Sequence, residues 1–82
     1  MAETYDARFF RNEQERHRRN AAKALEDARV SIAAAIAALG SASPQLAQHY
    51  ASSAAASAAD AARHVSALTA LNQVAFLAGP DD

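Results

Sequence analysis

The sequence of 82 residues predicts an all-α protein, an antiparallel two-helix hairpin with an alanine-rich interface. Helix-breaking residues occur at only two places, Gly40 with Pro44 and Gly79 with Pro80. The stretch 51–62 between them holds only alanine, serine and one aspartate, and alanine is the best helix former. Because its side chains are so small, another helix could approach this stretch closely. Apolar residues also recur at the spacings of three and four that indicate a helix face.

The first helix is expected over about residues 4–39. Glu3 and Asp6 lie near its start, where carboxylates suit the positive end of the helix dipole. Nothing breaks it before Gly40, which stands where helices often end on a left-handed residue. The residues expected on its contact face are Leu25, Ala28, Ile32, Ala35 and Leu39.

A loop over residues 40–43 is expected to lead into a second helix over about residues 44–78. Ser43 is a favoured N-cap and Pro44 a favoured first helical residue. Gly79 and Pro80 end this helix and leave a tail over residues 79–82. The residues expected on its contact face are Leu46, Tyr50, Ser53, Ser57, Ala61, His64, Leu68, Leu71 and Ala75.

The whole chain, residues 1–82, is expected to form one domain that associates. Two helices of similar length joined by a short loop favour an antiparallel coiled coil. A chain this short buries only about 60% of its unfolded surface and usually needs a disulfide, a metal or an oligomer for stability. Since the sequence has no cysteine, we expect a four-helix bundle, completed by dimerisation or by packing on a partner.

The open end of the hairpin, where both termini lie, is predicted to bind protein. Residues 11–20 include no aliphatic side chain, whereas the part of the second helix at the same level is apolar. An apolar surface that its own hairpin partner cannot bury marks an interaction site, and aromatic residues are favoured anchors. The predicted contact residues are Phe9, Phe10, Val65, Leu68, Leu71, Val74, Phe76 and Leu77.

These features predict a non-enzymatic interaction module, such as a small adaptor, inhibitor or assembly subunit. The serines lie without a nucleophile elbow, and no glycine-rich phosphate loop is present. A two-helix hairpin also leaves no room for the concave pocket of an enzyme. Two acid–histidine pairs, Glu13 with His17 and Asp60 with His64, are interpreted as helix-stabilising pairs. We therefore expect no cofactor and no metal site.

The alternative is a dimeric hairpin that binds RNA or DNA through the arginine-rich part of the first helix. The residues concerned are Arg11, Arg16, Arg18 and Arg19. In architecture alone, such a dimer resembles the Rop-type RNA-binding hairpin. The formal net charge is −1, and acids alternate with the arginines, unlike the dense basic patch of a nucleic-acid binder. In the protein-binding interpretation, the same arginines form the polar rim of the contact.

The sequence is expected to belong to a soluble cytoplasmic protein. Its start lacks the basic and apolar regions of a signal peptide. No apolar run approaches the roughly 20 residues that span a bilayer, so no membrane partner is expected.

Overall fold

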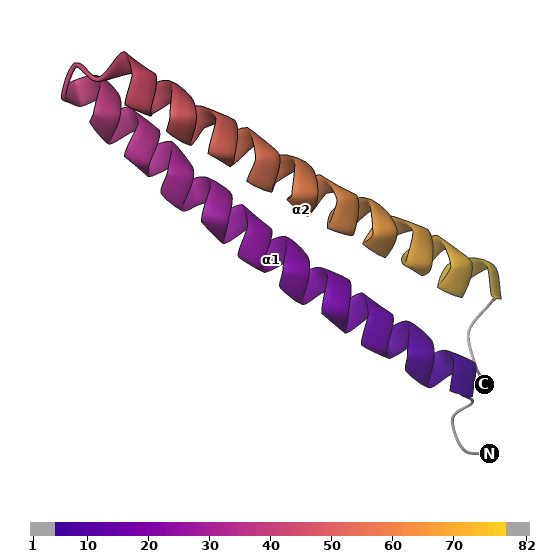
Figure 1. The fold of residues 1–82 in the computed structure, drawn as a ribbon. Helices are drawn as coiled ribbons and strands as arrows, with labels where there is room; N and C mark the ends of the chain where they lie inside the picture. Colours follow the sequence, from indigo (N-terminus) through magenta and orange to yellow (C-terminus); the bar gives the residue numbers. More distant parts are fainter. Residues whose placement is uncertain (1–4, 79–82) are drawn as a thin grey trace.

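The computed structural model describes the backbone of residues 5–78 and the side chains of residues 7–74. Two helices, α1 (Tyr5–Gly40) and α2 (Pro44–Ala78), are joined by a short turn. They pack against each other side by side in antiparallel directions, so α1 begins at the end of the hairpin where α2 finishes (Figure 1). The predicted all-α hairpin is confirmed. The expected tail over residues 79–82 and the side chains of Ala75, Phe76 and Leu77 lie outside the described residues.

The interface between the helices is built on alanine. The buried side chains in the described part of the chain, each between 2% and 7% exposed, are Ala21, Ala24, Ala28, Ala38, Ala47, Ala54 and Ala61. We call this set the alanine seam. Its members lie three, four, seven or ten residues apart along each helix, as the heptad pattern of a coiled coil allows. Half-buried Ser31 and Ala35 fill the remaining positions of this pattern between Ala28 and Ala38, and we call all positions of the pattern seam positions. Because a methyl group is the whole side chain, the two backbones can approach closely.

The expected contact face of α1 was wrong in its large residues. Leu25, Ile32 and Leu39 are each more than half exposed, and each lies one position after a seam position. Two stripes with identical spacing compete on this helix. The stripe of large residues, extended one heptad before Leu25, includes Arg18. The alanine stripe, extended in the same direction from Ala28, includes Ala24 and Ala21. Packing the large residues inward would therefore have drawn a charge into the interface, which is costly.

The expected contact face of α2 is mostly correct within the described side chains. Six of its residues are buried or half-buried: Tyr50, Ser57, Ala61, His64, Leu68 and Leu71. Leu46 and Ser53 are exposed instead, because each precedes a seam position by one residue. Along α2 the alanines and the large residues of this face lie on one stripe. The sequence therefore offers a single candidate for the inward face of α2, whereas α1 offers two.

The turn between the helices ends α1 with a Schellman hydrogen-bond pattern. The amide of Ser43 donates to the carbonyl of Ala38 at 2.9 Å, and the amide of Ala42 donates to that of Leu39 at 3.1 Å. Ala42 takes the left-handed conformation, with φ of 57°. We expected Gly40 in that role, but it is the last residue of α1. Since Ala38 and Ala47 both lie in the seam, the chain must reverse midway between them, at Ala42.

Candidate protein-interaction surface

Charge is strongly segregated along the hairpin. No Asp, Glu, Lys or Arg occurs from Val30 to Ala59, a run that includes the end of α1, the turn and the first half of α2. Because the helices are antiparallel, these two segments lie beside each other (Figure 1). We call this part of the molecule the uncharged half. The charged side chains of the described helices all lie at or before Arg29 and at or after Asp60.

Large apolar side chains are exposed along α1 in and next to this uncharged half. Leu25, Ile32, Ile36 and Leu39 are between 51% and 64% exposed. We call these four residues the apolar ridge. Their spacings of seven, four and three place them on one side of the helix. Val30, which is 55% exposed, lies roughly opposite, since two residues advance about 200° around a helix.

The side of the interface that carries the ridge can be assigned from a pocket near the turn. Ala34 of α1 and Leu46 of α2 line this pocket together, and each stands one position before a seam position. Positions before the seam therefore share one side of the hairpin, and positions after the seam share the other. Each ridge residue comes one position after a seam position, so the ridge lies on the side opposite the pocket. On the same side, α2 presents exposed Ala51, Ala55, Ala58 and Ala62, with Val65 beyond them.

We call those four alanines of α2 the alanine strip. The register of the hairpin places it beside two residues of the ridge, Leu25 and Ile32. Gln14 donates a hydrogen bond from Nε2 to Oδ1 of Asn72 at 2.8 Å, and His17 contacts His64. Counting from these pairs, residues 51–62 lie level with roughly residues 22–33 of α1. One side of the uncharged half therefore combines a bulky stripe on α1 with a smooth stripe on α2.

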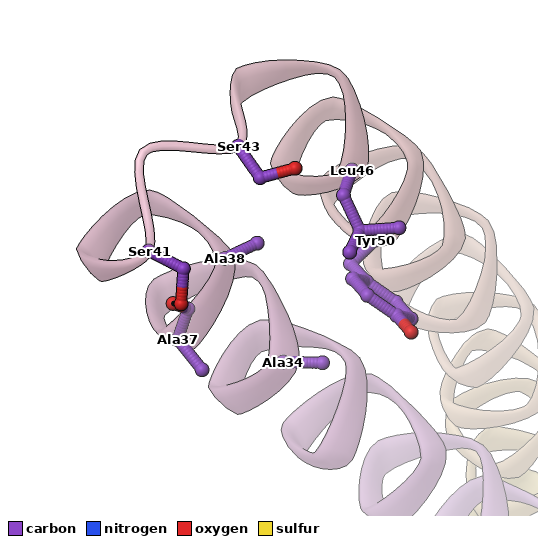
Figure 2. Close-up of a pocket in the computed structure, with 7 residues that line it drawn as sticks. All are labelled: Ala34, Ala37, Ala38, Ser41, Ser43, Leu46 and Tyr50. Carbon is purple, nitrogen blue, oxygen red and sulfur yellow. Dashed lines mark hydrogen bonds between the residues drawn. The ribbon is translucent and has the colours of Figure 1, made fainter.

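The pocket itself offers little for catalysis. It has a volume of about 280 Å³, at the lower limit of ligand-binding pockets. Figure 2 shows Tyr50 and the serines of the turn around an otherwise aliphatic wall. Its lining residues are Ala34, Ala37, Ala38, Ser41, Ser43, Leu46 and Tyr50. No carboxylate, imidazole or thiol is among them, so this pocket lacks a general acid–base pair.

The contact residues predicted at the open end fall into three groups. Phe9, Val65 and Val74 are about half exposed. Phe10, Leu68 and Leu71 are half-buried, and Phe10 packs edge-on against Phe9 with ring centroids 6.5 Å apart. The other two, Phe76 and Leu77, lie outside the described side chains. The hairpin therefore covers part of Leu68 and Leu71 with its own helix α1, which leaves less free apolar surface there than expected.

Three arginines in the arginine-rich part of α1 form ion pairs with glutamates of the same helix. Arg16 contacts Glu13 at 2.5 Å, Arg18 contacts Glu15 at 2.8 Å, and Arg19 approaches Glu15 at 3.6 Å. The hydrogen bond from Arg16 lowers the pKa of Glu13 and raises the pKa of Arg16. A similar hydrogen bond from Arg29 lowers the pKa of Glu26. These pairs are exposed, so each is worth little for stability, but they offset the positive charge of this part of α1.

Two histidines meet across the seam. Nδ1 of His17 lies 2.9 Å from Nδ1 of His64, and the ring centroids are 5.2 Å apart. One ring must donate and the other accept. Glu13 and Asp60 lie 3.5 Å and 3.8 Å from the respective Nε2 atoms. In the described part of the chain, no group of three or more His, Cys, Asp or Glu residues is placed to hold a metal ion. The pair is best understood as a polar contact that ties the helices together.

Neither described helix is long and apolar enough to cross a membrane. Comparisons with protein-family models, curated proteins and solved structures found no match.

Proposed function

We propose that the chain is a non-enzymatic protein-interaction module, an adaptor or assembly subunit, that docks through the side carrying the ridge and the alanine strip. The apolar ridge is the observation that carries this proposal. Four Leu and Ile side chains are more than half exposed, three of them within a run that holds no charge. Fully burying one such side chain is worth about 1.5–3 kcal/mol, so a protein that covers all four gains considerable affinity.

The residues predicted at the open end keep a secondary place in this proposal. Val65 lies on the ridge side and is exposed enough to extend the contact along the hairpin, whereas Phe9 and Val74 stand one position before seam positions and therefore lie on the other side. Their surroundings are charged, which suits the polar rim of an interface rather than its centre. The arginines of α1 fit the same role, since their glutamate partners leave a mixed surface.

Binding of RNA or DNA is the weaker candidate. A nucleic-acid surface needs a concentration of positive charge, and the glutamates beside Arg16, Arg18 and Arg19 offset it. In an RNA-binding dimer, the apolar ridge would contact the second hairpin and not the nucleic acid. Steep loss of RNA binding with salt, together with loss on changing these arginines to glutamate, would support this candidate instead.

The proposal is tested by site-specific photo-crosslinking in the cells that make the protein. A photoreactive amino acid replaces Ile32 in one variant and Val30 in another. Both positions are about equally exposed on the same helix, but they lie on nearly opposite sides of it. We expect a protein adduct from position 32 and little or none from position 30. Absence of any protein adduct at position 32, or equal adducts at both positions, would contradict the proposal.

A further inference from the structure

We propose that the protein bound at this surface is a second copy of the chain, arranged with both turns at the same end of a four-helix bundle. This inference rests on the proposed function, because it names the partner for the same surface. Three independent features of the hairpin support it: the area that it leaves exposed, the distribution of its charges, and the shapes of the ridge and the strip.

The exposed area is too large for a compact monomer. The chain exposes 6147 Å², whereas a folded monomer of its mass, 8.6 kDa, is expected to expose about 4,700 Å². The excess is about 1,450 Å². Two copies that each buried this area would form an interface of about 2,900 Å², within the range of obligate homodimers. One contact with an identical partner would cover an area of this size.

The charge distribution permits an identical partner. When two copies meet through the same surface, each charge near the symmetry axis faces a like charge, which is destabilising. The run from Val30 to Ala59 avoids this problem because it carries no Asp, Glu, Lys or Arg. The nearest cation on the ridge side, Arg29, is paired with Glu26 of its own helix. A second copy therefore meets no uncompensated like charge over the uncharged half.

The shapes of the two stripes determine the orientation. A two-fold axis parallel to the hairpin places α1 of each copy over α2 of the other. Leu25 and Ile32 of one copy then pack on the alanine strip of its partner, and this large-on-small contact occurs twice. The other two ridge residues, Ile36 and Leu39, lie nearer the turn than the strip does. Every neighbouring pair of helices is antiparallel, as in up-down bundles. A perpendicular axis would instead oppose ridge to ridge and strip to strip, with bulk crowded on one side and a gap on the other.

Sedimentation equilibrium of the purified chain tests the association. We expect the wild type to be a dimer of twice 8.6 kDa. Replacing Ile32 with glutamate removes two buried side chains per dimer and introduces two charges, so we expect the dissociation constant to rise at least roughly 100-fold. Val30→Glu is the matched control, with an expected change of less than about threefold. A wild-type monomer, or equal effects of the two variants, would overturn the inference.

Distances between spin labels test the orientation without a destabilising substitution. The chain has no cysteine, so labels can be attached at Asn12→Cys and Gln45→Cys, two exposed positions near opposite ends of the hairpin. With both turns at one end, each label lies near its symmetry mate, across a bundle whose helices are about 10 Å apart. Turns at opposite ends would lengthen at least one distance toward the hairpin length of 63 Å and overturn the proposed arrangement.

The crosslinking result separates failure of this inference from failure of the proposed function. An adduct with the mass of two chains at position 32 supports both. An adduct with a different protein, combined with a monomeric purified chain, overturns the second copy and leaves the interaction module standing. No protein adduct at all contradicts the interaction module and therefore the dimer as well.

Discussion

Ala42 carries the strain of the turn. It adopts φ of 57°, a left-handed conformation that costs an L-residue roughly 1–2 kcal/mol and that glycine adopts freely. Two residues earlier, Gly40 is helical and has open space where a Cβ would lie. A glycine in a helix loses stability relative to alanine. The sequence thus has glycine and alanine in the opposite order from the one that this turn favours.

Exchanging these two residues should stabilise the hairpin. We expect Ala42→Gly to raise the free energy of unfolding by about 1 kcal/mol and Gly40→Ala by about 0.5–1 kcal/mol, measured by urea denaturation at a fixed protein concentration. Ala37→Gly, in the last turns of α1, is the control and should lower stability by about 1 kcal/mol. If Ala42→Gly were as destabilising as this control, the turn would differ from the one described.

A second prediction concerns the hydrogen bond between the two histidines. Because His17 and His64 share one hydrogen bond, replacing either by leucine leaves the other nitrogen without its cross-helix partner, at an expected cost of about 1 kcal/mol. Replacing both removes the unpaired group and should cost less than the two single changes together. A double-mutant cycle in urea measures this coupling. Strictly additive effects would show that the two rings do not interact.

The helices owe their close approach to the alanine seam. Ala61 is 2% exposed, and its methyl group leaves no space for extra carbons between the backbones. We expect Ala61→Leu to lower the free energy of unfolding by about 1–3 kcal/mol through overpacking. Ala59→Leu, two residues earlier and exposed, should stay within about 0.5 kcal/mol of the wild type. Equal stability of both variants would indicate a looser interface than the seam describes.

Much of the hairpin could be predicted from the sequence because its signals are local. Helix-breaking residues mark the turn and the end of α2, and Ser43 with Pro44 marks the start of that helix. The inward face of α1 could not be chosen from spacing alone, since alanines and large residues repeat at the same intervals. Hydrophobicity favours the stripe of Leu25, whereas close packing and the position of Arg18 favour the stripe of Ala21.

The same ambiguity explains why the docking surface proposed from the structure differs from the open end that the sequence predicted. The open end was predicted to bind protein because residues 11–20 have no aliphatic side chain. In the structure, however, the half-buried Leu68 and Leu71 lie on the heptad stripe of α2 that faces α1. Outward placement of Leu25, Ile32 and Leu39 then creates a ridge that the sequence prediction had assigned to the interior. The charge-free run from Val30 to Ala59 was the available signal for this surface.

Taken as one object, the hairpin is a long rod with a charged half and an uncharged half. Among the side chains that the structure describes, the buried ones are all alanines, and most of the large apolar ones are exposed. For a small domain without disulfides, such a distribution leaves little buried apolar area to offset the entropy cost of folding. The proposed dimer supplies further buried apolar area with a second ridge and a second alanine strip.

Nuclear Overhauser contacts in a mixed dimer test this arrangement most directly. One preparation carries labelled Ile, Leu and Val methyl groups, the other carries labelled Ala methyl groups, and the two are combined and re-equilibrated. We predict intermolecular contacts from Leu25 and Ile32 to alanines of the strip on the other copy, and none from Val30. Intermolecular contacts confined to the open end, around Val74, or the absence of any such contact, would contradict the proposed docking surface.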